Sequence, residues 1–468
     1  MKNALPALGL GLLLFAGSTA SADGRIDLSG YYRLFFGNAW NNNLAGSRDR
    51  TSDSGMHNRL ELNWVFRPTD EVSVFWRLRA PFAQRWGNDG ERPTAYWAER
   101  LGTTAMTDFV YGRVTGDWGA LYLGRLALNF GYTGLANLGW FPTGPDNNYT
   151  LFQPFALWNN SVDGLRWEIR RDDGAKLLVQ FNRLETVQTF GNTGDEDSAD
   201  LLWVEGGKTW TGGGASLGAI LVRDRATAHG APTAGDSTRA FKAFFLNPAV
   251  SQSWGDFGLH FEGKAGRGRD YASGLRHDGY AFYLDLDYNY GPGNLNLAGW
   301  WASGGGQDGR RHDLVGLGRA FGPLVVAYGD NLLPHIRGAT AVAIANANSG
   351  AAGNRPGFAT SPSRNDVSNH RVLDLNGNHS LTGDFRLTWA LAYLALNKVR
   401  EGASRSIGFE TDLGFQFKLL DNLEWRSTFG YLFAGRAFDG YGGSPSPRGA
   451  GYSAADACSW YNTLTFNF

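Results

Sequence analysis

The chain has 468 residues and a formal net charge of −1, with one cysteine and three methionines. Its near balance of charge gives no support to nucleic-acid binding, and the single Cys458 excludes an internal disulfide framework and any CxxC metal or redox motif. The 65 glycines, 30 phenylalanines, 18 tyrosines and 17 tryptophans favour many strands and turns over helices.

The first residues follow the pattern of a secretory signal peptide. Lys2 supplies a basic start, Ala4–Phe15 an apolar core, and Ala20-Ser21-Ala22 a small-residue cleavage pattern. The apolar run is too short to span a membrane. We therefore expect residues 1–22 to be removed and residues 23–468 to form one folded domain.

Stretches of alternating apolar and polar residues follow this segment. Successive side chains of a strand point to opposite faces, so residues 26–36, 57–67 and 72–79 each predict a strand with one apolar and one charged face. The alternation is ambiguous in residues 107–114 and 120–126. Further strands are predicted at residues 165–170, 177–181, 201–208, 215–222, 241–246, 257–264, 280–290, 295–302, 314–319, 324–328, 371–379, 385–394 and 460–468.

The clearest pattern is the predicted hairpin Ile407–Phe433. Its first strand alternates apolar residues with Glu410 and Asp412, the turn is Leu420-Asp421-Asn422, and the second strand alternates aromatic residues with Glu424 and Arg426. About 9–11 residues of tilted strand suffice to cross a bilayer. The hairpin is long enough to do so, with its apolar side facing lipid.

The predicted connections alternate between short and long. Short turns are expected near residues 68, 116, 172, 212, 254, 292, 322, 382 and 421, and longer polar, Gly-rich segments lie between them. Short periplasmic turns and long extracellular loops are typical of outer-membrane barrels. The pattern predicts an all-β fold, a single antiparallel transmembrane β-barrel of about 18–20 strands.

The lipid environment decides which face is inside. Each Arg or Lys facing hydrocarbon at the midplane would cost about 2–4 kcal/mol, so the charged face must line the lumen. A secreted β-sandwich or propeller is the alternative, but it leaves the long strands and aromatic outer faces unexplained. The predicted pore-lining residues are Arg33, Arg59, Glu61, Arg77, Arg79, Arg166, Glu168, Arg170, Asp285, Asp287, Asp384, Arg386, Glu410, Asp412, Glu424 and Arg426.

The last strands carry a resemblance to a known family. Gly408-Phe409-Glu410-Thr411-Asp412, Asp421-Asn422-Leu423 and Gly430-Tyr431-Leu432-Phe433-Ala434-Gly435 resemble the closing hairpin of the alginate-export/porin family of outer-membrane barrels, and Leu123-Gly124-Arg125 resembles a porin strand. Asn467-Phe468 resembles the C-terminal aromatic signal read by the barrel-assembly machinery. The resemblance implies an Arg/Lys-rich lumen that exports an anionic polysaccharide. Here the basic residues cluster early and the acidic ones late, which resembles the transverse field of a general porin equally well.

Other candidate sites have simpler explanations. Residues 330–370 form a long loop that could constrict the lumen or stay outside it. The aromatic residues of 127–160 could stack on sugars or form an interfacial girdle. Asp195, Glu196, Asp197 and Asp200 match no calcium-binding spacing, and no catalytic or nucleotide-binding motif is present. We expect no enzyme activity, no cofactor and no metal.

The sequence thus predicts a passive outer-membrane channel of a Gram-negative bacterium for small hydrophilic or charged solutes. A polysaccharide exporter is a second transport hypothesis. A barrel sleeve around a periplasmic multihaem cytochrome is an alternative of another class. Expected partners are outer-membrane lipid and lipopolysaccharide, the barrel-assembly machinery, the transported solute or polysaccharide and a possible periplasmic protein, with no nucleic acid.

Overall fold

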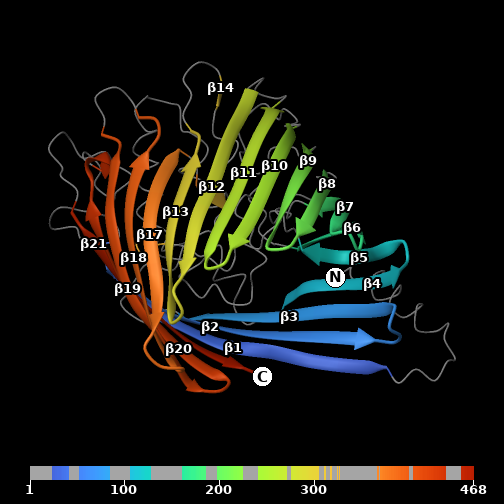
Figure 1. Ribbon diagram of the computed structural model, residues 1–468, viewed down its shortest axis with the longest axis horizontal. Helices are drawn as coiled ribbons and strands as arrows, with labels where there is room; N and C mark the ends of the chain where they lie inside the picture. The colour runs from blue at the N-terminus through green and yellow to red at the C-terminus, as the bar shows by residue number, and fades with distance from the viewer. Residues whose placement is uncertain are drawn as a thin grey trace, which may run out of the picture.

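In the computed structural model, eighteen long strands pair antiparallel in chain order and close into a barrel (Figure 1). The structure describes residues 24–41, 52–84, 106–127, 161–185, 198–224, 241–270, 276–304, 310–311, 317–318, 324, 326, 366–367, 369–399, 404–438 and 455–468. The wall strands are β1 (Arg25–Trp40), β2 (Ser52–Arg67), β3 (Val72–Gln84), β4 (Met106–Gly116), β5 (Gly119–Ala127), β6 (Ser161–Arg170), β7 (Ala175–Glu185), β8 (Ser198–Trp210), β9 (Gly213–Asp224), β10 (Phe241–Trp254), β11 (Phe257–Asp270), β12 (Arg276–Asn289), β13 (Gly293–Ala302), β17 (His370–Ser380), β18 (Phe385–Leu396), β19 (Ser406–Leu420), β20 (Leu423–Ala434) and β21 (Ala457–Asn467).

The barrel closes between its first and last strands. β1 pairs with β21 from Tyr31 opposite Asn467 to Trp40 opposite Cys458, and Figure 1 shows the blue first strand beside the red last ones. The terminal residue extends this seam, because the backbone N–H groups of Gly30 and Phe468 each donate to the other residue's carbonyl oxygen, at 2.9 and 3.0 Å. Closure removes the unpaired edges that an open sheet would leave in lipid.

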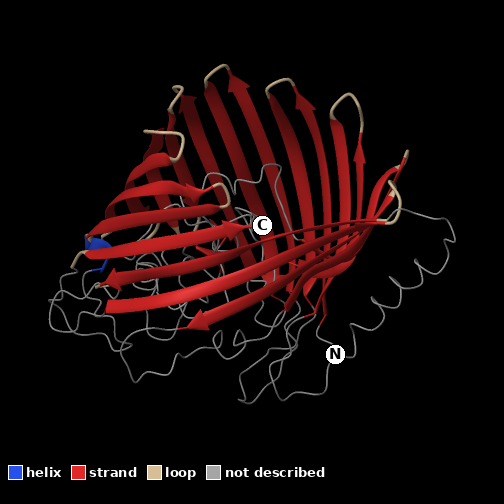
Figure 2. Cartoon of the chain, turned by 90° about the horizontal axis from the view of Figure 1, so that it is seen from below, coloured by secondary structure: helices blue, strands red, loops and turns tan. Residues whose placement is uncertain are grey.

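The predicted strand pattern is confirmed for most of the chain. Eight of the nine predicted short turns join neighbouring wall strands, at residues 68–71, 117–118, 171–174, 211–212, 255–256, 290–292, 381–384 and 421–422. Figure 2 shows several of them as tan loops at the strand ends. The predicted hairpin Ile407–Phe433 forms β19 and β20. The predicted removal of residues 1–22 concerns residues outside the described part of the chain.

The prediction of two wall strands at residues 314–319 and 324–328 was wrong, because β13 pairs directly with β17, and the predicted turn near 322 lies outside the described residues. Of the described residues there, Leu317–Gly318 form a short strand, β15, which pairs with β16 (Asp366–Val367) in a separate small sheet, and residues 324 and 326 are not in a strand. A third short strand, β14 (Arg310–Arg311), lies parallel to the end of β12. Residues 303–369 therefore form one connection between β13 and β17. A 3₁₀ turn, Arg436–Phe438, follows β20.

Alternation along the strands separates an apolar outer face from a polar inner face. On β12, Phe282, Leu284 and Leu286 are 40–47% exposed, whereas Asp285 between them is fully buried. Exposed apolar side chains recur in this way on strands all round the barrel. Such a surface is stable only against hydrocarbon, so the outer face is the lipid face. Within the described residues, no helix is long and apolar enough to cross a membrane.

The turn between β6 and β7 shows how a short turn fixes the register. The backbone N–H of Arg171 donates to Ala175 O at 2.9 Å, and Gly174 N–H donates to Arg171 O at 3.0 Å. Gly174 has φ of +83°, a conformation that L-residues adopt only with strain. Thr209 N–H donates to Gly174 O at 2.9 Å, which ties this turn to the end of β8.

We expect Gly174→Ala to destabilise the barrel more than Gly291→Ala. Both glycines have a left-handed φ, of +83° and +84°, which costs an alanine about 1–2 kcal/mol. A Cβ at Gly174 would also collide with the Thr209 carbonyl oxygen, whereas a Cβ at Gly291 meets open space. Urea unfolding in lipid vesicles measures both variants. Equal losses would contradict the tight packing of this turn against β8.

Candidate lumen walls and their charges

Most of the predicted pore-lining residues lie on the inner face, where cations outnumber carboxylates on some strands and carboxylates outnumber cations on others. A basic wall spans β1–β8, and an acidic wall spans β12–β19. In the ring of eighteen strands, β5 and β17 lie nine strands apart, so the two walls face each other across the lumen. The basic wall contains Arg33, Arg77, Arg113, Arg166, Arg170 and Lys176, and the acidic wall contains Asp285, Asp287, Asp374, Glu410 and Asp412.

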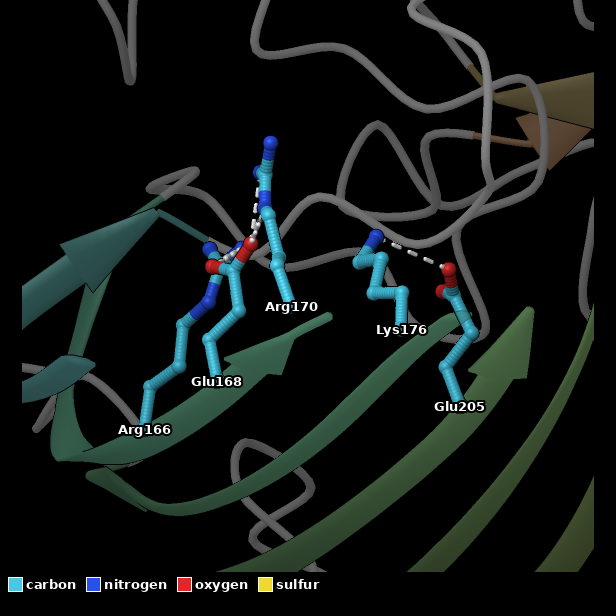
Figure 3. A network of polar contacts seen from close by, with 5 residues as sticks. All are labelled: Arg166, Glu168, Arg170, Lys176 and Glu205. Carbon is cyan, nitrogen blue, oxygen red and sulfur yellow. Dashed lines mark hydrogen bonds and ion pairs between the residues drawn. The ribbon is translucent and has the colours of Figure 1, made fainter. Parts of the chain in front are cut away.

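At the centre of the basic wall, two carboxylates hold three cations in place (Figure 3). Glu168, which is buried, accepts from Arg166 Nη2 at 3.0 Å and from Arg170 Nε at 2.6 Å. Lys176 Nζ lies 3.1 Å from Glu205 Oε1 on the neighbouring strand. Each carboxylate lowers the cost of holding its cations in the lumen, but this network keeps an excess of positive charge.

A tyrosine ring contacts two arginines of this wall. Tyr122 on β5 lies between β4 and β6, and the guanidinium carbons of Arg113 and Arg166 are 5.6 and 5.4 Å from its ring centroid. Tyr111 contacts the same ring at a centroid distance of 5.9 Å. Arg113 is exposed and has no ion pair to any residue that the structure describes. It is therefore a cation of this wall that is accessible from the lumen.

The basic wall continues to the barrel seam. Arg77 Nε lies 3.1 Å from Glu61 Oε1, and the Tyr31 hydroxyl donates to Glu61 Oε2 at 3.2 Å. Arg33 on β1 donates to the Thr465 hydroxyl on β21 at 3.0 Å, and its guanidinium lies 4.7 Å from the Tyr31 ring centroid. The Arg33–Thr465 bond joins the first and last strands and the others join β1 and β3 to β2, so the residues here have a structural role beside their charge.

Opposite this surface, the carboxylates of the acidic wall follow two rows of the strand register. The upper row runs from Asp285 through Ala298, Asp374 and Ala392 to Glu410. The lower row runs from Asp287 through Asn296, Asn376 and Ala390 to Asp412. Alanine on the intervening strands leaves the carboxylates without bulky neighbours. Two negative rows thus cross five adjacent strands.

An asparagine ladder holds these carboxylates. Asn376 Nδ2 donates to Asp374 Oδ2 at 2.7 Å and also lies 3.2 Å from Asn296 Oδ1. Asn296 Nδ2 donates to Asp287 Oδ1 at 2.8 Å, and the Tyr283 hydroxyl donates to Asp285 Oδ2 at 2.8 Å. One oxygen each of Asp285 and Asp374 has no hydrogen-bond partner among the residues that the structure describes. Neutral donors fix the carboxylates without cancelling their charge.

A piece of the connection between β13 and β17 lies against the acidic wall inside the barrel. The backbone N–H of Val326 donates to Glu410 Oε1 at 2.6 Å, and Leu324 and Val326 are buried. Glu410 is on the inner face of β19, so this contact places residues 324 and 326 within the lumen. The sequence had predicted a wall strand for these residues. Their inward course narrows the space between the two walls.

Several predicted residues have other positions. Asp384 is exposed in the short turn 381–384. It precedes the first residue of β18, Phe385, so it is not part of the wall. Arg386, Glu424 and Arg426 lie near the same end; Arg386 donates to the Ser380 hydroxyl at 3.2 Å, and Arg426 pairs with Glu424. Arg59 and Arg79 lie in β2 and β3, opposite Arg33 and Glu61 in the register, but their side chains lie outside the described part.

Sequence reasoning missed four parts of this surface, which are Arg113 with Tyr122, Lys176 with Glu205, Asp374, and the asparagine ladder. Asp374 and Asn376 alternate with Leu373 and Leu375, so this strand's pattern already carried the signal. Arg113 and Tyr122 lie in the two strands whose alternation is ambiguous. The acidic segment 195–197 and the aromatic loop 127–160 lie outside the described residues. No group of three or more potential metal ligands occurs in the described part.

We expect Lys176→Met to lower the free energy of unfolding by about 1.5–3 kcal/mol, because it removes a charged hydrogen-bond donor from buried Glu205. Lys208→Met is the matched control. Lys208 is exposed on the other face of β8, and its removal should change stability by less than about 0.5 kcal/mol. Urea unfolding followed by tryptophan fluorescence measures both variants. Equal effects would show that the Lys176–Glu205 contact does not stabilise the wall.

Comparison with known proteins supports the barrel fold. No family model and no curated protein matches the sequence. Among solved structures, the chain is similar to OccK9 (OpdG) of Pseudomonas aeruginosa, with 13% identity, 95% of this chain and 98% of that chain covered and a TM-score of 0.52. It is also similar to the outer membrane protein opdK of the same organism, with 9% identity, 95% and 98% covered and a TM-score of 0.50. The architecture is that of an outer-membrane β-barrel.

Proposed function

We propose that the protein is a passive channel of the outer membrane for small hydrophilic solutes, and that solutes pass between a basic and an acidic wall. The observation that carries this proposal is the separation of charge. Arg113 on β4 and Arg166 on β6 each lie eight strands away from Asp374 on β17 in a closed ring of eighteen. Passage down a gradient needs no chemical step and no cofactor.

Separated charges produce a field across the lumen. A charge pair interacts more strongly near low-dielectric protein walls than in bulk water, and a field confined in a pore orients dipoles and counter-ions. A solute with an anionic and a cationic group therefore crosses with its anionic end towards Arg113. A solute with charge of one sign is drawn to one wall and repelled by the other. We infer that dipolar solutes, such as zwitterions of amino-acid size, are the best-matched class.

The segment at residues 324 and 326 supports a limit on solute size. It lies inside the barrel and is bonded to Glu410, so it occupies space next to the acidic wall. A lumen narrowed in this way favours small solutes over chains of linked sugars. The acidic wall would also repel an anionic polymer, which makes export of such a polymer the weaker hypothesis.

Swelling of liposomes that contain the purified protein tests this function. We expect zwitterionic amino acids to enter faster than sugars of equal size, and sugars to enter faster than dianionic acids. Uniform rates for all small solutes would contradict the role of the field. Exclusion of every solute would contradict an open channel, and entry only of anionic oligosaccharides would favour the export hypothesis.

A further inference from the structure

The outer face of the barrel carries a row of charges that the channel function does not use. On strands β5–β12, one outward residue near the extracellular end of each strand is the direct register partner of the next. In chain order of the strands the row is Arg125, Asp163, Arg183, Asp200, Arg223, Lys242, Arg269 and Arg276. Every member lies within two residues of the end of its strand.

The row changes character at β9. From β5 to β8 its signs alternate, so each cation has a carboxylate as its cross-strand neighbour, and opposite charges in such pairs are stabilising. From β9 to β12 all four residues are cationic, and Arg267 adds a fifth cation directly below Arg269. Among the outward positions described on these four strands, Asp278, opposite Arg267, is the one carboxylate. We call these five cations the outer basic patch.

The outer basic patch lies directly above apolar and aromatic side chains. Below Lys242, Phe244 is 41% exposed, and below Arg223, Leu221 is 50% exposed. Below Arg276 on β12, the Tyr280 ring packs against Trp301 in a tilted arrangement at a centroid distance of 4.5 Å. Exposed aromatic rings of this kind mark the level where the hydrocarbon meets the headgroups. The cations one or two positions higher are therefore at the level of the lipid headgroups.

Like charges at neighbouring register positions are destabilising, and strands lie only about 4.8 Å apart. Asp200 lies opposite Arg223, but the register partners of Lys242 and Arg269 are all cations, so this part of the row is unfavourable unless an anion lies against it. If solvation alone explained these cations, other strands would carry charges at the same level. The described outward ends of β18–β21 carry Tyr393, Phe409, Phe433 and Trp460 instead. Lys242 and Arg269 have contacts within the chain as well, but the excess of positive charge over the four strands remains.

We propose that the outer basic patch binds the phosphate groups of a lipid in the outer leaflet, and the lipid that fits is the phosphorylated glycolipid base of lipopolysaccharide. Guanidinium groups bind phosphate oxygens in a bidentate manner, and the row offers three arginines and a lysine on adjacent strands. The aromatic and aliphatic side chains below would contact the acyl chains. The bound lipid would neutralise the row and hold β9–β12 together.

Binding of lipid A with and without its phosphates tests this proposal. The purified barrel is incubated in detergent with bisphosphorylated lipid A or with the dephosphorylated form, and the bound fraction is measured by native mass spectrometry. We expect the wild-type protein to bind the phosphorylated form at least about tenfold more tightly, as charge-assisted contacts require. We expect Lys242→Gln with Arg276→Gln, two cations whose register partners are also cations, to abolish most of this preference.

The matched control is Arg125→Gln with Arg183→Gln, which removes two cations from the alternating part of the row. This control should retain the preference for phosphate within about twofold, because those cations already face carboxylates. Equal binding of both forms of lipid A by the wild type would overturn the proposal, and so would equal losses in the two double variants. Single-channel conductance should be unchanged in both, so a failure here is distinct from a failure of the channel function.

Discussion

Arg113→Glu shifts the ion selectivity of the channel towards cations, by about fivefold in the ratio of cation to anion permeability. The substitution changes the local charge by two units, and each unit charge at about 4 Å from an ion in water interacts with it by about 1 kcal/mol, somewhat more than RT. Arg113 is the residue for this test because it is exposed and makes no ion pair to the described residues. Its replacement leaves the Arg166–Glu168–Arg170 network in place.

The measurement is the reversal potential across a tenfold gradient of potassium chloride in a planar bilayer. Arg113→Gln should give a shift of the same sign and about half the size, since one charge is lost instead of reversed. Lys208→Glu is the control for an equal charge change on the outer face, and it should leave the reversal potential unaltered. An identical shift from Lys208→Glu would mean that surface charge, and not the basic wall, sets the selectivity.

Leu284→Arg destabilises the barrel by about 2–4 kcal/mol, the cost of an arginine facing hydrocarbon near the bilayer midplane. Leu284 lies in the middle of β12 on the outer face, where it is 41% exposed. Its neighbour Asp285 points inwards, so the two residues differ in environment although they are adjacent in sequence. Equilibrium unfolding in urea, in vesicles of fixed lipid composition, measures the loss.

Thr388→Arg is the control for Leu284→Arg. Thr388 lies on the inner face of β18, two residues from Arg386 on the short-turn side of the wall. An arginine there faces the lumen, and we expect a change of less than about 1 kcal/mol. If both variants lost the same free energy, the assignment of the outer face to lipid would be contradicted.

The wall of the barrel could be predicted because its pattern is local. Residues 280–290 and 407–433 alternate apolar and charged side chains along the whole length of a long strand. Such a pattern is expected where the two faces of the strand lie in different environments. Turn residues such as Asp173-Gly174 and Asp421-Asn422 fix the short connections, and eight of the nine predicted turns are present. The separation of basic and acidic strands followed from the same alternation, because parity assigns each charge to the lumen.

The connection 303–369 could not be predicted in the same way. Leu324, Val325 and Val326 have high β-propensity, and sequence alone favoured a short wall strand there. In the structure, Val326 instead bonds to Glu410, which lies 84 residues further along the chain. A contact of this kind depends on the closed barrel, so no local pattern signals it. Likewise, glycine and threonine residues near Arg113 and Tyr122 interrupt the alternation of apolar and polar residues, so the sequence did not identify these two lumen residues.

Single-channel recording in a planar bilayer tests the central claim most directly. We predict a stable open conductance for the purified wild-type protein. We also predict reduced current when a zwitterionic amino acid is added at high concentration, because solutes that enter the field between the two walls displace ions. The absence of any conductance from correctly folded protein would contradict an open channel between the two walls.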